Sequence, residues 1–282
     1  MKEIFFNPKK TLNAGGNLIS LQTPIIMGIL NATPDSFFAG SRVQSEESIL
    51  KKTETMIAEG AAIIDIGGYS TRPNAPEVSE QEEMQRVIRV VKLLKNNFPK
   101  IPLSIDTFRT DVAQTSVDAG ADIINDISGG QMDEKMFEMA GNLQVPYILT
   151  HTRGTPQTMM ELTNYDHLLK EILDYFEIRI SKLYQHGVKD IVLDLGFGFA
   201  KTIDQNFELL RNLELFKMFE LPMLIGVSRK SMIYKTLNGT VEESLNGTSV
   251  LHTAAILKGA SILRVHDVKA AKEAIVLCQK LI

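Results

Sequence analysis

The sequence predicts an α/β fold, a (β/α)8 barrel with a short N-terminal hairpin, and three observations support this. Eight short apolar runs recur along the 282 residues, and each is followed by a segment with helical periodicity. Polar side chains stand at the C-terminal ends of these runs, as Asn31, Asp106 and Asp194 illustrate. In such a barrel these ends gather on the reactive face. Because charged groups beside buried strands are costly unless a site uses them, we expect an enzyme.

Length and composition limit the class of protein. One barrel of ~250 residues with a short extension accounts for the chain, so we expect a single domain over residues 1–282. The net charge of −4 and the lack of a basic run argue against nucleic acid as a partner. Cys278 is the only cysteine, which favours a cytoplasmic location. We expect no membrane association, because no run approaches the ~20 apolar residues of a span and no signal peptide is evident.

The N-terminal extension, residues 1–23, is predicted to form a hairpin that closes the bottom of the barrel. Its first part contains the apolar segment 4–6, and residues 14–17 read Ala-Gly-Gly-Asn. Adjacent glycines followed by asparagine are typical of a tight turn between two strands.

The eight strands are predicted where aliphatic runs end in polar residues. In order they are IIMGILN, ending at Asn31; AAIIDIGG, with Asp65; PLSIDT, with Asp106; DIINDI, with Asn125 and Asp126; PYILTH, ending at His151; DIVLDLGFGF, with Asp194; PMLIGVSRK, ending at Arg229 and Lys230; and SILRVHD, with Arg264, His266 and Asp267.

The helices between these strands repeat apolar residues at the 3.6-residue period. Ser79 and Glu82 have the spacing of a capping box at the start of one helix. The last helix is expected to pack its apolar face, which runs from Ala271 to Leu281, against the barrel.

The connectors alternate in chemistry, which suggests four βαβα quarters, although similar loops could arise independently. Strands two, four, six and eight follow a glycine that can end a helix, and the other strands follow a proline. The glycines are Gly60, Gly120, Gly187 and Gly259, and the prolines are Pro24, Pro102, Pro146 and Pro222.

Two long loops follow the first and second strands, at residues 31–40 and 67–73. Both contain glycine, proline and polar residues, which is typical of mobile lids over a site. Ordinary surface turns are the alternative for either loop alone. Their occurrence on the same face of one barrel favours lids.

Seven segments then carry a resemblance. LNATPDSF, GGYSTRP, SIDT, IINDI, LDLGFGF, GVSRKS and RVHD, in this order, resemble the dihydropteroate synthase family of folate biosynthesis, from about Ile25 to the C-terminus. The resemblance implies a transferase that joins 6-hydroxymethyl-7,8-dihydropterin pyrophosphate to p-aminobenzoate, which forms 7,8-dihydropteroate and pyrophosphate. It also implies a homodimer through the later helices and competition by sulfonamides.

The resemblance assigns the pterin to Asp106, Asn125, Asp194 and Lys230. The chemistry of these residues agrees, because a carboxylate can accept two parallel hydrogen bonds from the N–H edge of a pterin. Lys230 would donate to the ring carbonyl or to N5. A loop cap is the alternative for one aspartate, but it explains four such residues poorly.

The leaving diphosphate is expected near the loops after the last two strands. Arg264 and His266 would bind it where Asp267 opens the last helix, and Arg264 could also lie on the pterin face. The resemblance places Mg²⁺ on Asn31, an oxygen ligand of the kind this ion prefers. His266 as a structural hydrogen-bonding residue is the alternative.

The aromatic amine needs an apolar slot with an anion site. Phe37, Pro73 and Phe199 resemble the ring slot of the family, and Ser231 resembles its carboxylate anchor. Core packing is the alternative for Phe199.

Catalysis would be electrostatic and positional, without a Ser-His-Asp or Cys-His pair. Pyrophosphate would leave a resonance-stabilised pterin cation, which the amine attacks. The resemblance places Asp35 near this cation or beside Arg72, and Arg72 and Thr71 would close the second loop. Lys230, Arg264 and His266 complete the expected catalytic group.

Five single positions and one segment, Phe38-Ala39-Gly40-Ser41 in place of the usual Asp-Gly-Gly, depart from the family pattern without removing an expected ligand. Tyr69 stands in place of the usual Glu, Leu195 of Pro and Ala200 of Gly, and Thr150 and Thr152 replace Met. The alternatives to a synthase are a pterin-binding methyltransferase and a noncatalytic paralogue. A methyltransferase does not need the STRP and SRKS segments, and a noncatalytic paralogue would have lost binding residues that this chain retains.

Overall fold

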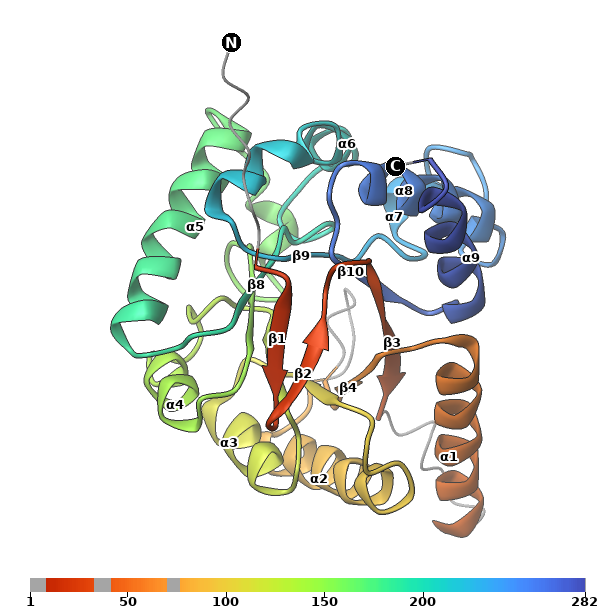
Figure 1. Ribbon diagram of the computed structural model, residues 1–282. Coiled ribbons are helices and arrows are strands. Elements are labelled where there is room, and N and C mark those ends of the chain that lie inside the picture. The colour runs from red at the N-terminus through yellow and green to blue at the C-terminus, as the bar shows by residue number, and fades with distance from the viewer. Residues whose placement is uncertain (1–8, 33–41, 70–76, 282) are drawn as a thin grey trace.

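The eight predicted strands close into one parallel barrel that helices surround (Figure 1). The computed structural model describes residues 9–32, 42–69 and 77–281. The strand order around the barrel is β10-β3-β4-β5-β6-β7-β8-β9, so neighbours in sequence pair and the last strand closes on the first. The predicted fold class is therefore confirmed.

Each predicted apolar run contains one barrel strand. The strands are β3 (Ile25–Asn31), β4 (Ile63–Gly67), β5 (Leu103–Asp106), β6 (Ile123–Asp126), β7 (Tyr147–Thr150), β8 (Ile191–Asp194), β9 (Met223–Ile225) and β10 (Ile262–Val265).

Helices cover the outside of the barrel and bury their apolar faces against the strands. They are α1 (Arg42–Glu59), α2 (Glu80–Asn97), α3 (Thr110–Asp118), α4 (Met136–Leu143), α5 (Leu168–Gln185), α6 (Ile203–Arg211), α7 (Ser231–Tyr234), α8 (Leu245–Leu257) and α9 (Val268–Cys278), with short 3-10 turns η2 (Met159–Glu161), η3 (Leu213–Phe219) and η4 (Glu242–Ser244). Within the described ranges, no helix has the length and apolar character that crossing a bilayer requires.

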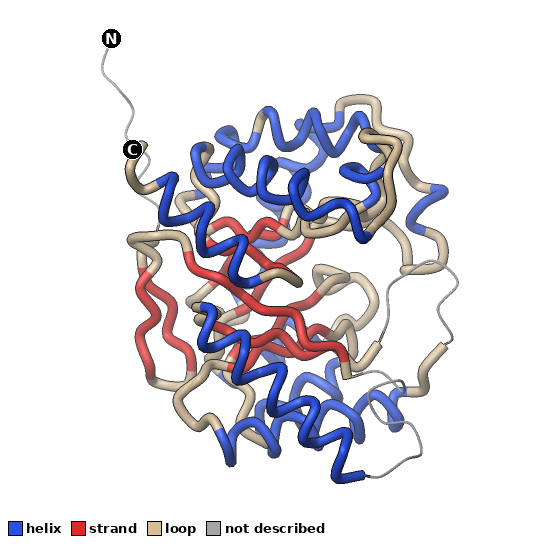
Figure 2. Tube along the Cα trace, turned by 90° about the vertical axis from the view of Figure 1, so that its right-hand side faces the viewer, coloured by secondary structure: helices blue, strands red, loops and turns tan. Residues whose placement is uncertain are grey.

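The N-terminal hairpin consists of β1 (Thr11–Ala14) and β2 (Asn17–Ser20), which pair antiparallel through the predicted turn. Leu12, Ala14 and Leu21 pack against the first halves of the barrel strands in a core of their own. Figure 2 shows the hairpin at one end of the barrel. The hairpin thus covers the end where the strands begin, which leaves the strand C-termini for a site. The predicted apolar segment 4–6 lies outside the described residues.

The glycine connectors are confirmed by their backbone conformation. Gly60, Gly120, Gly187 and Gly259 all have φ between 84° and 113°, a region that favours glycine over residues with a Cβ. These residues end α1, α3, α5 and α8 and lead into the even-numbered strands of the prediction.

Two helix-end predictions need correction. Ser79 accepts the Glu82 N–H at 3.3 Å, but the Glu82 carboxylate pairs with Arg86, so the predicted capping box is only half formed. Leu281 is 71% exposed, because α9 ends at Cys278 and no longer carries its apolar face to that position.

Ala200 has a left-handed backbone, with φ of 47°, at a position where the resembling family has glycine. Because a Cβ is disfavoured there, Ala200→Gly is expected to raise the free energy of unfolding by about 0.5–1 kcal/mol in urea denaturation. Ala113→Gly, inside α3, is the matched control and should lower it by about as much. A destabilising Ala200→Gly would show that packing of the methyl group outweighs the strain.

Candidate active site

The C-terminal ends of the strands bring four of the predicted residues into one network. Arg264 in β10 donates through Nε to Asp65 in β4 at 2.6 Å, and a terminal guanidinium nitrogen donates to Asp106 at the end of β5. Asn125 in β6 donates to the two Asp65 oxygens at 3.3 and 3.2 Å. The carboxylate of Asp194, at the end of β8, is close enough to raise the pKa values of Arg264 and Asp106. Carboxylates, an amide and a guanidinium therefore form the floor of the barrel mouth.

Asp65 is the central residue of this floor, and the sequence prediction gave it no role. It is fully buried and fixes both Arg264 and Asn125. A carboxylate inside the apolar run IIDIG was the available signal, because a buried charge needs a partner. Removal of the Arg264 partner would leave the Asp65 charge buried without a cation.

The Asn125 side chain is only half satisfied within the described part of the chain. Its nitrogen binds Asp65, whereas its buried Oδ1 has no hydrogen-bond donor there. A buried acceptor without a donor is costly, so its presence at a barrel mouth indicates a ligand N–H. This supports the predicted placement of Asn125 at a heterocycle.

Charges on the floor shift the pKa of Asp106. Burial, and then the neighbouring carboxylates of Asp65, Glu83 and Asp194, raise this pKa to about 7, although Arg264 opposes the shift. Burial lowers the pKa of the Arg264 guanidinium, but the neighbouring carboxylates raise it, and the pKa lies above its ordinary value. Arg264 is thus a permanent cation, whereas Asp106 titrates near neutral pH.

Lys230 reaches the floor from the loop after β9. Its ammonium donates to the Phe197 carbonyl and lies 4.6 Å from the centre of the Phe199 ring. Burial lowers the pKa of Lys230 to about 8, and the Asp194 carboxylate opposes this shift. Phe199 is half-buried and so presents an apolar edge beside the cation, as predicted, whereas Phe197 is core.

The loop after β8 is held by Lys201, which the prediction did not include. The fully buried ammonium of Lys201 donates to the Gly196 and Phe199 carbonyls at 3.0 and 3.1 Å, and to Nδ1 of His151 at 2.8 Å. Burial and the Lys201 charge lower the pKa of His151 well below its ordinary value, so the ring accepts as a neutral imidazole. The same loop turns the Gly196 N–H onto Asp194 at 2.8 Å.

An ion pair and a set of hydrogen bonds join the loop after β9 to the loop after β10. Arg229 makes a two-pronged ion pair with Asp267, at 2.8 and 2.6 Å, and has a left-handed backbone with φ of 55°. Ser228 Oγ accepts the His266 backbone N–H at 3.2 Å and lies 3.1 Å from its ring Nδ1. Ser231 follows as the first residue of α7.

These contacts determine the protonation of His266. Partial burial and the charges of Arg264 and Arg229 lower its pKa to about 4, so the ring is neutral near pH 7. Because Ser228 Oγ already accepts the backbone N–H, its own proton can go to Nδ1. With the hydroxyl proton on Nδ1, the ring proton would stand on Nε2, as a donor at the rim of the mouth.

Asn31, the predicted magnesium ligand, is exposed at the end of β3. Oδ1 of Asn31 and the Asp106 carboxylate both lie near the backbone of Gly67. A Cβ added to Gly67 would lie 3.9 Å from Oδ1 of Asn31 and 3.8 Å from a carboxylate oxygen of Asp106. The described residues contain no group of three acidic, histidine or cysteine side chains that could hold a metal by itself. An ion at Asn31 would therefore need further oxygen ligands, from water, from a substrate or from residues outside the described ranges.

Five predicted site residues lie outside the described residues. They are Asp35, Phe37, Thr71, Arg72 and Pro73. The described part of the site combines an acceptor-rich floor, an apolar edge and a rim of cations and N–H donors, which suits a flat heterocycle with an anionic substituent.

Comparisons with known proteins agree with this chemistry. The family described as pterin binding enzyme matches residues 27–266 of the chain. The dihydropteroate synthase of Synechocystis is 45% identical over 248 residues, or 87% of this chain and 86% of the relative. The dihydropteroate synthase of Escherichia coli K12 is 43% identical over 265 residues, or 93% of each chain.

Solved structures extend the similarity to three dimensions. A Yersinia pestis dihydropteroate synthase with a sulfonamide drug superposes with a TM-score of 0.88 at 39% identity, and the match covers 96% of this chain and 98% of that one. A Thermus thermophilus dihydropteroate synthase with 4-aminobenzoate superposes with a TM-score of 0.86 at 33% identity, over 96% and 100% of the two chains.

Proposed function

This chain belongs to the pterin-binding enzymes and, among them, to the dihydropteroate synthases, and from this premise we propose how its residues divide the reaction. The reaction joins 6-hydroxymethyl-7,8-dihydropterin pyrophosphate to p-aminobenzoate and forms 7,8-dihydropteroate and pyrophosphate. The observation that carries the proposal is the floor of Asp65, Asp106, Asn125 and Arg264 at the barrel mouth. The direct test is pyrophosphate release with and without p-aminobenzoate, and no dependence on the amine would contradict it.

The floor and Lys230 are proposed to bind the pterin. Asp194 and Asp106 offer acceptors for the N–H edge of the ring, and Asn125 offers its Oδ1, which has no donor among the described residues. Lys230 donates to the opposite edge, and Arg264 covers a ring face. The same positive groups hold the substrate in place while its bond to the diphosphate breaks.

The rim is proposed to bind the leaving diphosphate. His266 directs its Nε2 proton to an oxygen of this group, and Arg264 contributes charge. Mg²⁺, which neutralises diphosphate charge when bound, would be held by Asn31, a hard oxygen ligand. Calorimetry with pyrophosphate tests this assignment without turnover: Mg²⁺ should strengthen binding to the wild type and much less to Asn31→Ala.

The amine slot is proposed to combine Phe199 and Ser231 with Phe37, Thr71, Arg72 and Pro73. If substrate orders this slot, p-aminobenzoate should bind well only when pyrophosphate and a pterin are present. Calorimetry measures the affinity for p-aminobenzoate in the presence and absence of both ligands. A sulfonamide should compete with p-aminobenzoate for the slot. Tight binding of p-aminobenzoate to the bare protein would contradict the prediction.

Pterin binding is expected to have a bell-shaped pH dependence. Asp106, with a pKa of about 7, must be ionised to accept, and Lys230, with a pKa of about 8, must be protonated to donate. Affinity for a pterin without phosphates should therefore fall about tenfold per pH unit below the lower pKa and again above the higher one. Calorimetry from pH 5 to 9 gives the profile. Asp106→Asn should remove the contribution of Asp106 to the acid limb, which leaves that of Asp194, whose pKa burial also raises. A flat wild-type profile would contradict both assignments.

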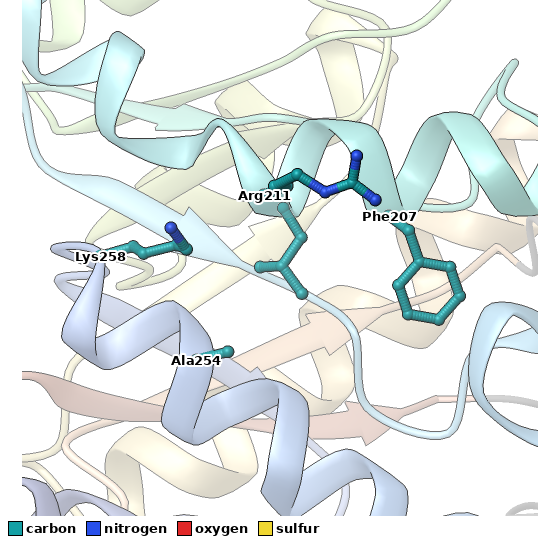
Figure 3. A pocket seen from close by; sticks show the side chains of 5 residues that line it. Phe207, Arg211, Ala254 and Lys258 are labelled. Carbon is teal, nitrogen blue, oxygen red and sulfur yellow. The ribbon is translucent and has the colours of Figure 1, made fainter.

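A homodimer is proposed through the later helices. Val250, Ala254 and Leu257 share one face of α8, and Val250 and Leu257 are 60% and 45% exposed. This face borders a shallow groove of about 250 Å³ between α6 and α8, lined by Phe207, Leu210, Arg211, Ala254 and Lys258 (Figure 3). The groove contains none of the site residues, so it suits a partner rather than a substrate.

Sedimentation of the wild type and of Val250→Glu tests the dimer. The wild type should sediment as a dimer at micromolar concentration and the variant as a folded monomer, whereas a monomeric wild type would contradict the proposal. A cytoplasmic location is proposed from the single cysteine, Cys278, which is buried.

A further inference from the structure

Thr150, the last residue of β7, has a buried hydroxyl that no described residue binds. The whole residue is inaccessible to solvent, and its Oγ1 has no hydrogen-bond partner in the described part of the chain. The backbone carbonyl of Thr150, in contrast, accepts from the Tyr175 hydroxyl at 2.7 Å. A buried hydroxyl that makes no hydrogen bond is costly, so its presence at a strand end beside the site indicates a ligand.

The alternation of side chains along β7 directs Thr150 into the barrel. Leu149 packs in the outer core, between the strands and the helices, whereas Ile148 packs in the inner core that the hairpin closes. Successive residues of a strand face opposite sides, so Thr150 shares the inner face with Ile148. It lies one layer nearer to the C-terminal ends of the strands, at the barrel mouth.

The inner-face neighbours of Thr150 are two residues of the candidate site. Asp194 on β8 lies directly opposite Thr150 in the strand register, and Asn125 on β6 lies opposite Ile148. The strand that carries Thr150 is therefore the one between Asn125 and Asp194. Both of these residues are proposed to accept N–H groups of the pterin.

Ser104 has a second buried hydroxyl without a partner among the described residues, but its position differs. It lies opposite Asp65 in the strand register and precedes Asp106, the last residue of β5, by two positions. Ser104 is thus deeper in the barrel than the floor residue Asp106. Of these two hydroxyls, that of Thr150 is the one at a strand end.

The edge of a dihydropterin needs a donor as well as acceptors. Its N8–H and its 2-amino group donate, and the ring nitrogen N1 between them accepts. The Asn125 amide already donates to Asp65, and Arg264 donates to Asp65 and Asp106. A threonine hydroxyl can donate its single proton, and that of Thr150 is not used by any described acceptor.

We propose that the Thr150 hydroxyl is a pterin-binding group that donates to N1, between the ring donors that Asn125 and the carboxylates accept. The inference rests on the proposed function, in which the floor binds the pterin. The resembling family has Met at this position, and a thioether has no proton to donate. The contact would therefore belong to this chain and would make its affinity depend on a nitrogen at position 1 of the ring.

Thr150→Val is the test variant, because valine has nearly the same shape and lacks only the hydroxyl. We expect its Kd for a dihydropterin without phosphates to rise about fivefold, as for the loss of one neutral hydrogen bond. The thermal midpoint without ligand should stay at or above that of the wild type, because the variant no longer buries an unbonded hydroxyl. Thr150→Ser, which keeps the hydroxyl, should bind the pterin within about twofold of the wild type.

Thr53→Val is the matched control. Thr53 on α1 is also fully buried, and its hydroxyl also lacks a partner among the described residues, but its helix lies outside the barrel. This variant should leave the Kd for the pterin unchanged. Wild-type affinity in Thr150→Val would overturn the inference, and so would equal losses of affinity in Thr150→Val and Thr150→Ser, or a loss accompanied by a lower thermal midpoint.

A pterin analogue with C–H in place of N1 tests the atom that the hydroxyl binds. The wild type should prefer the pterin to this analogue, and the preference should shrink about fivefold in Thr150→Val, because the partner of N1 is then absent. The preference should be unchanged in Thr53→Val. The same preference in the wild type and in Thr150→Val would overturn the assignment to N1.

Asp194→Asn in the same calorimetric assay separates the inference from the proposed function. If Asp194→Asn weakens pterin binding and Thr150→Val does not, the inference fails and the floor keeps its proposed role. If neither variant changes the Kd, both fail. If only Thr150→Val raises it, the hydroxyl contact stands and the role of Asp194 fails.

Discussion

Asp194→Asn is expected to keep the barrel intact and to weaken pterin binding by roughly 30-fold or more, a loss of ~2–5 kcal/mol. The amide oxygen can still accept the Gly196 N–H, which now holds the carboxylate at 2.8 Å. The amide nitrogen, however, would face an N–H of the pterin with a second donor. The Asp194 carboxylate also opposes the effect of burial on the pKa of Lys230, so its loss should lower that pKa further.

Calorimetry with a pterin that lacks phosphates measures the effect, because it isolates the floor from the diphosphate rim. Asp190→Asn is the matched control at the opposite end of the same strand, where the carboxylate pairs with Lys9 at 2.6 Å. Such a surface pair contributes only ~0–1 kcal/mol and lies away from the mouth. Near-wild-type affinity in Asp194→Asn would remove this carboxylate from the pterin site.

The strand-end residues were predictable because the barrel topology alone determines where they lie. Once eight parallel strands are recognised, Asp106, Asn125 and Asp194 must share one mouth, whatever the details of packing. The glycine connectors were predictable for a similar reason, since a left-handed helix end is a local property of the backbone. Both inferences use only sequence-local signals and one topological rule.

The contacts that position these residues were not predictable in the same way. Asp65 with Arg264 and Lys201 with His151 join residues 199 and 50 positions apart. Which carboxylate receives the guanidinium depends on how far each side chain reaches across the barrel, which no local pattern encodes. The partly exposed apolar face of α8 was hidden for another reason: polar Thr248 and His252 are buried while apolar Val250 and Leu257 are exposed, so the periodicity of apolar residues does not separate buried from exposed positions.

Arg264→Gln is expected to reduce turnover by about 100-fold or more, because it removes a fixed positive group from the developing charge of the leaving diphosphate. The same change should lower the free energy of unfolding by ~3–5 kcal/mol, since Asp65 is fully buried and would lose its cation. Steady-state kinetics and urea denaturation measure the two effects separately.

The double variant Asp65→Asn/Arg264→Gln distinguishes these two roles of Arg264. It removes the buried charge together with its partner, so most of the lost stability should return while turnover stays low. Arg264 also opposes the upward shift of the Asp106 pKa, so Arg264→Gln alone should move the acid limb of pterin binding above pH 7, where the wild type has a pKa of about 7. The double variant should move it less, because it also removes the Asp65 carboxylate, which raises this pKa. If the double variant recovered turnover along with stability, Arg264 would be only the partner of Asp65, and the charge that assists the leaving group would have to come from His266 and Lys230.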